Sequence, residues 1–66
     1  MTLDKLGTKA VVDCIIDNRI GRRLISMGIL PGKEVEYIRG KDPIEIRVDN
    51  IFLVLRKEEA KCVFLK

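Results

Sequence analysis

The chain has 66 residues, of which 47% are hydrophobic and 35% are charged, and its formal net charge is +3. This length predicts one domain spanning residues 1–66, and the composition is typical of a globular chain and excludes a disordered one. No apolar run approaches the roughly 18 residues that span a bilayer. Met1–Thr8 contains Asp4 and lacks the apolar segment of a signal peptide. A cytoplasmic protein without direct membrane insertion is therefore predicted.

The first half of the chain predicts a strand, a short helix and a turn. Lys9–Ile16 is rich in β-branched residues, which favours a strand. Asp17-Asn18 supplies an N-cap for a helix over about Arg19–Met27, and Gly28 suits the left-handed residue that follows a helix end. Leu30–Lys33 suits a type II turn, with Pro second and Gly third.

The second half predicts a β-meander. Its strands are expected at Lys33–Arg39, Ile44–Val48, Ile51–Leu55 and Lys61–Leu65, with a loop at 40–43, a two-residue turn at Asp49-Asn50 and one helical turn at Lys57–Ala60. Because Ile51–Leu55 is apolar on both faces, it is predicted to be a central strand that is covered on each side. The expected fold is therefore mainly β: a small, partly open SH3-like β-barrel of five strands, with one short α-helix inserted after the first strand.

The predicted helix divides its apolar residues between two directions. At 100° per residue, Ile20, Leu24 and Met27 share one sector that is expected to pack on the barrel. Ile25 points elsewhere and lies beside Gly21, which predicts a shallow apolar notch on the helix surface.

An apolar notch with arginines around it has the usual composition of a protein–protein contact. The predicted partner-binding residues are Arg22, Arg23, Ile25, Met27, Ile29 and Leu30, although for Met27 a place in the core is the stronger explanation. The predicted role of Gly28, Pro31 and Gly32 is to set the backbone geometry beside these residues.

The residue types speak against catalysis and against a resident metal. The chain has no histidine, its only serine, Ser26, has no evident base, and no phosphate-binding loop motif is present. Cys14 and Cys62 lie too far apart in sequence for the paired spacing of zinc ligands. Both are interpreted as small buried hydrophobic residues, with a redox pair as the alternative. No catalytic residue, cofactor or specific iron site is predicted.

The positive charge leaves two classes of partner open. Arg19, Arg22 and Arg23 crowd one helix, which suits an acidic protein or, as the alternative, the phosphates of a nucleic acid. Nucleic-acid barrels also expose aromatic side chains for base stacking. Here the three aromatic residues fall in apolar strand patterns: Tyr37, Phe52 and Phe64. Acidic residues also intersperse with the basic ones, so a protein partner is favoured.

The segment Arg22–Gly32, RRLISMGILPG, resembles the signature of the FeoA family. The similarity continues through Pro43–Val48 (PIEIRV) and Ile51–Ala60 (IFLVLRKEEA), so that it covers nearly the whole chain. The resemblance implies a β-barrel of SH3 type that acts as an accessory protein in ferrous iron uptake.

The resemblance also implies a partner, the FeoB-type membrane transporter, contacted at its cytoplasmic GTPase part or its pore. At the level of the family it further implies an association with transition metal ions. Self-association through the helix notch is left open. The same domain occurs at the C-terminus of metal-dependent repressors, but this chain lacks their helix-turn-helix and metal ligands, so a free-standing partner fits better.

Overall fold

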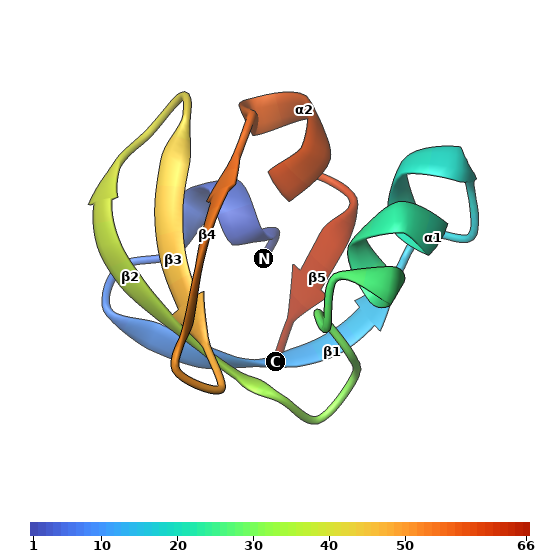
Figure 1. Ribbon diagram of the computed structural model, residues 1–66, viewed down its shortest axis with the longest axis horizontal. Coiled ribbons are helices and arrows are strands. Elements are labelled where there is room, and N and C mark those ends of the chain that lie inside the picture. The colour runs from blue at the N-terminus through green and yellow to red at the C-terminus, as the bar shows by residue number, and fades with distance from the viewer.

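Five antiparallel strands form one curled sheet in this computed structural model, which describes residues 1–66 (Figure 1). In chain order the elements are η1 (Leu3–Lys5), β1 (Lys9–Ile15), α1 (Arg19–Ser26), β2 (Glu34–Gly40), β3 (Ile44–Val48), β4 (Ile51–Leu55), α2 (Lys57–Ala60) and β5 (Val63–Leu65). The strand order is β4-β3-β2-β1-β5. This is the mainly-β, SH3-like architecture that the sequence predicts, with a short helix after the first strand.

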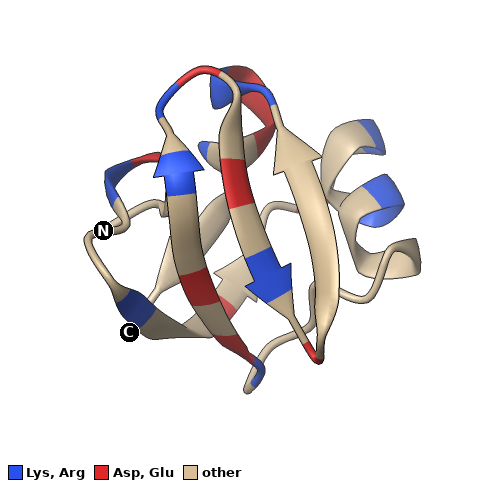
Figure 2. Ribbon diagram, turned by 60° about the vertical axis from the view of Figure 1, so that its left-hand side comes forward, with Lys and Arg blue, Asp and Glu red and all other residues tan.

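The core lies on the concave face of the sheet. β3 alternates as predicted, with Ile44, Ile46 and Val48 buried and the two residues between them half-buried. Leu24 of α1 and Ala60 of α2 are fully buried against the same cluster. The helices therefore cover the inner face of the sheet, while the outer face of β2, β3 and β4 is open to solvent (Figure 2).

The turns follow the local chemistry of their residues. Asp49 and Asn50 have φ of 50° and 65°, the left-handed pair that a two-residue hairpin turn requires. The Lys33 N–H donates to the Leu30 carbonyl oxygen at 3.1 Å, and Gly32 has φ of 89°, as a type II turn demands. Both turn predictions are confirmed.

A β-bulge in β1 changes which residues face the core. Val12 pairs with Leu65 and Cys14 pairs with Phe64, so one extra residue, Asp13, is inserted and the alternation shifts. Cys14 is therefore exposed, whereas Cys62 is buried. The prediction that both cysteines are buried is wrong for Cys14.

β4 is an edge strand, not the predicted central one. It pairs only with β3, and the side chains of Ile51, Phe52 and Val54 are 55%, 68% and 59% exposed. An apolar pattern on both faces of a strand is compatible with burial of both faces. Whether the strand has a second neighbouring strand depends on the strand order, and β4 is the last strand of the sheet. Phe52 is accordingly an exposed aromatic residue, contrary to the burial that its strand pattern suggested.

Candidate partner-binding surface on α1 and the following turn

The N-terminus of α1 is anchored tightly to the end of β1. The Gly21 N–H donates to the Asn18 side-chain oxygen at 2.7 Å, which is the N-cap bond. Gly21 is buried, and a Cβ atom at this position would lie 1.8 Å from the Ile16 carbonyl oxygen. The notch predicted beside Gly21 does not exist, because the backbone of Ile16, directly after β1, fills the space that the missing side chain leaves.

The N-cap gives a first testable prediction. Asn18→Ala is expected to lower the free energy of unfolding by about 1 kcal/mol, because it leaves the Gly21 N–H without its acceptor. Asn18→Asp keeps an acceptor oxygen and is expected to retain most of that stability. Urea denaturation of both variants measures the difference, and equal losses would contradict the capping role.

The C-terminus of α1 ends in a Schellman motif. The Gly28 N–H donates to the Ile25 carbonyl oxygen at 3.0 Å, the Ile29 N–H donates to that of Leu24 at 3.1 Å, and Gly28 has φ of 101°. This reversal turns Ile29 back into the core, where it is fully buried beside Leu24 in the same cluster. The prediction that Ile29 offers surface to a partner is therefore wrong.

The two apolar residues that remain exposed flank this reversal. Ile25 is 41% exposed and Leu30 is 38% exposed, while Met27 is half-buried. Pro31, next in the chain, is exposed as part of the type II turn. We name the exposed positions of this segment, the half-buried Met27 and the two arginines that precede them the α1–turn surface: Arg22, Arg23, Ile25, Met27, Leu30 and Pro31.

The two arginines of this surface contact carboxylates of their own chain. Arg22 pairs with Asp17 at 3.0 Å, and both side chains are largely exposed. Such a pair contributes little to stability and exchanges readily for another carboxylate. Arg23 pairs with Glu59 of α2, whose carboxylate is mostly buried and also accepts the Arg56 N–H at 2.8 Å. Arg22 is thus the more available of the two for a partner.

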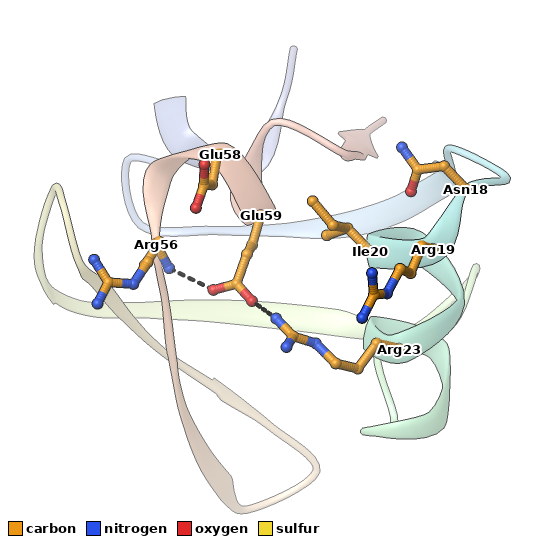
Figure 3. A pocket seen from close by; sticks show the side chains of 7 residues that line it. All are labelled: Asn18, Arg19, Ile20, Arg23, Arg56, Glu58 and Glu59. Carbon is orange, nitrogen blue, oxygen red and sulfur yellow. Dashed lines mark hydrogen bonds and ion pairs between the residues drawn. The ribbon is translucent and has the colours of Figure 1, made fainter.

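A hollow of about 730 Å³ lies on another side of α1, between α1 and α2 (Figure 3). Glu59 reaches between Arg56 and Arg23 and ties the two helices together. Neither Ile25 nor Leu30 lines this hollow, which is polar except for one isoleucine: its lining is Asn18, Arg19, Ile20, Arg23, Arg56, Glu58 and Glu59. The sequence did not predict this hollow. The only local signal for it was the spacing of Glu59, three residues after Arg56, which is typical of a capping box at the start of a helix.

The charges on the sheet speak against a nucleic-acid groove beside the exposed Phe52. Arg47 pairs with Glu36, and Arg39 pairs with Glu45 at 3.1 Å, so that both signs alternate across β2 and β3 (Figure 2). Single-strand binding uses a continuous positive track with stacked aromatics. α1 differs from these strands, because its sequence contains three arginines and no acidic residue.

No three side chains of Cys, Asp or Glu are grouped so that they could hold a metal ion. None of the helices combines the length and the apolar character that crossing a membrane requires.

Comparison with known proteins identifies close structural relatives. A family model described as the FeoA domain matches residues 1–66. The chain is similar to a zinc-complexed FeoA from Stenotrophomonas maltophilia, described as an SH3 domain protein, with 32% identity over all of this chain and 89% of that one and a TM-score of 0.89. It is also similar to iron(II) transport protein A from Clostridium thermocellum, with 29% identity and a TM-score of 0.90. This match covers 100% of this chain but only 44% of that one.

A FeoA-like protein from Clostridium acetobutylicum gives 29% identity, coverage of 100% and 84%, and a TM-score of 0.91. A manganese-dependent transcriptional repressor shares the fold alone, at 18% identity over 98% of this chain and 40% of that one, with a TM-score of 0.85. No curated protein matches the sequence.

Proposed function

The chain belongs to the FeoA family, and from this we propose that it is a non-enzymatic accessory protein of bacterial ferrous iron uptake in the cytoplasm. Its role lies in iron transport, the process named for its relative from Clostridium thermocellum. The finer part of the proposal is that the α1–turn surface binds the cytoplasmic part of a FeoB-type transporter.

The observation that carries this proposal is the pair of exposed apolar side chains on a rigid backbone. Ile25 and Leu30 remain exposed on either side of Gly28, and the hydrogen bonds of the Schellman motif and of the type II turn hold the backbone of this segment in place. Because the backbone is already ordered, a partner that covers these side chains does not have to order it, which favours binding. Arg22 adds a bidentate donor that is available to a carboxylate of the partner.

Ile25→Glu tests this surface most simply. Because the Ile25 side chain is partly exposed, the variant is expected to fold. In the complex, however, the glutamate would place an unpaired charge in the buried contact with the partner. If Ile25 is an anchor residue, binding to the purified cytoplasmic part of the transporter is expected to weaken by about 30-fold or more. The measurement is titration calorimetry or biolayer interferometry with both proteins purified.

Ile38→Glu is the matched control for this test. Ile38 lies on β2 and is 37% exposed, close to the exposure of Ile25, but it is outside the α1–turn surface. It is expected to bind as the unaltered chain does. Unchanged affinity in Ile25→Glu, or an equal loss in both variants, would refute the assignment of this surface.

A further inference from the structure

β4 presents a free strand edge with four backbone groups that lack a partner strand. The two-residue turn makes Val48 and Ile51 a hydrogen-bonded pair, so bonding to β3 alternates along β4. The backbone N–H and C=O groups of Leu53 and Leu55 bond to β3. Those of Phe52 and Val54 point the other way, to the edge of β4 that faces away from β3. β4 ends the sheet, so no strand of this chain meets them.

This edge lacks the features that usually protect an edge strand. Proteins place charged residues, proline or a covering segment at such positions. β4 has the sequence IFLVL, without a charge or a proline, and Phe52 and Val54 are 68% and 59% exposed. A short, uncharged, apolar strand with free backbone groups is suited to accept another strand.

We propose that β4 pairs with β4 of a second copy of this chain, antiparallel and about a two-fold axis that passes at Leu53. In this register Phe52 of one copy lies opposite Val54 of the other, and Ile51 lies opposite Leu55. All four free backbone groups of each strand then form hydrogen bonds. Registers shifted by two residues would match only part of them, because Phe52 or Val54 would face the residues that flank the strand.

The side chains that this register brings together are complementary. Phe52 and Val54 form aromatic–β-branched cross-strand pairs on the outer face, a favourable combination. This self-complementarity favours a second copy over an unrelated extended segment.

The interface is small, and this sets the expected strength. Strand addition over five residues buries less than the roughly 1,200 Å² of a stable complex, so a dissociation constant of about 10 µM to 1 mM is expected. Dimerisation should therefore appear only at high protein concentration. The inference concerns β4 alone and does not depend on the proposed function of α1.

Analytical ultracentrifugation of the full chain from about 10 µM to 1 mM tests the inference. The unaltered chain is expected to dimerise in this range. Val54→Pro removes an N–H that has no partner in the monomer, so the fold is expected to persist, whereas dimerisation should weaken at least tenfold. Ile38→Lys, which alters an equally apolar side chain on β2, is expected to dimerise as before.

A disulfide test checks the register and leaves the N–H and C=O groups of the strand edge unaltered. Because Leu53 is half-buried against the core, circular dichroism first establishes that the Leu53→Cys variant is folded. In a Cys14→Ser background, Leu53→Cys places two thiols directly opposite each other in a non-hydrogen-bonded pair, the closer kind, and oxidised dimer should accumulate. Phe52→Cys places its thiol opposite Val54 and should cross-link far more slowly. A chain that stays monomeric at 1 mM, a dimer that survives Val54→Pro, or equal cross-linking of both cysteine variants would overturn the proposal. So would pairing of β4 only with a strand of another protein.

Discussion

Gly21→Ala is expected to lower the free energy of unfolding by at least about 3 kcal/mol. The new Cβ would lie 1.8 Å from the Ile16 carbonyl oxygen, which belongs to the backbone and cannot rotate away as a side chain would. A chain of this length is expected to have about 3–10 kcal/mol of stability in total. The variant should therefore lose about a third of its stability or more, and α1 should detach from the end of β1 or shift away from it.

Gly7→Ala is the matched control for Gly21. A Cβ at Gly7 would meet no atom within 4 Å, so this variant is expected to stay within about 1 kcal/mol of the unaltered chain. Urea denaturation monitored by circular dichroism compares the two. A Gly21→Ala variant as stable as Gly7→Ala would mean that α1 does not approach β1 as closely as described.

Leu24→Ala is expected to cost about 2–5 kcal/mol, because it leaves a cavity where a fully buried side chain packs. Its neighbour Ile25 is 41% exposed, and Ile25→Ala is expected to cost less than about 1 kcal/mol. The two residues are adjacent in the same helix, so the contrast separates packing from helix propensity. Similar losses for both, measured by urea denaturation, would show that Ile25 belongs to the core and is not available to a partner.

Features set by short stretches of sequence were predictable. Asn18, Gly28 and the Pro31-Gly32 pair each act on backbone groups within a few residues, so their cap, helix stop and turn could be inferred without knowledge of the fold. The alternation of β3 was equally clear, because one face of that strand is buried and the other is not.

Features set by distant parts of the chain were not predictable in this way. The edge position of β4 depends on which strand occupies the other side, and the exposure of Cys14 depends on a bulge that forms only against β5. The Arg23–Glu59 pair joins two helices that are far apart in sequence. Ile29 is an intermediate case. Gly28 predicts where the helix ends, and the Schellman motif formed at this glycine also turns the next residue back into the core.

Binding of the transporter to the α1–turn surface can be tested by a titration followed by NMR. ¹⁵N-labelled protein is mixed with increasing amounts of the unlabelled cytoplasmic part of a FeoB-type transporter, and the amide shifts are followed. We expect the largest changes at Arg22, Ile25 and Leu30, with little change at Arg39 and Glu45 on the outer face of the sheet. Changes confined to the sheet, or spectra that do not change at all, would contradict it.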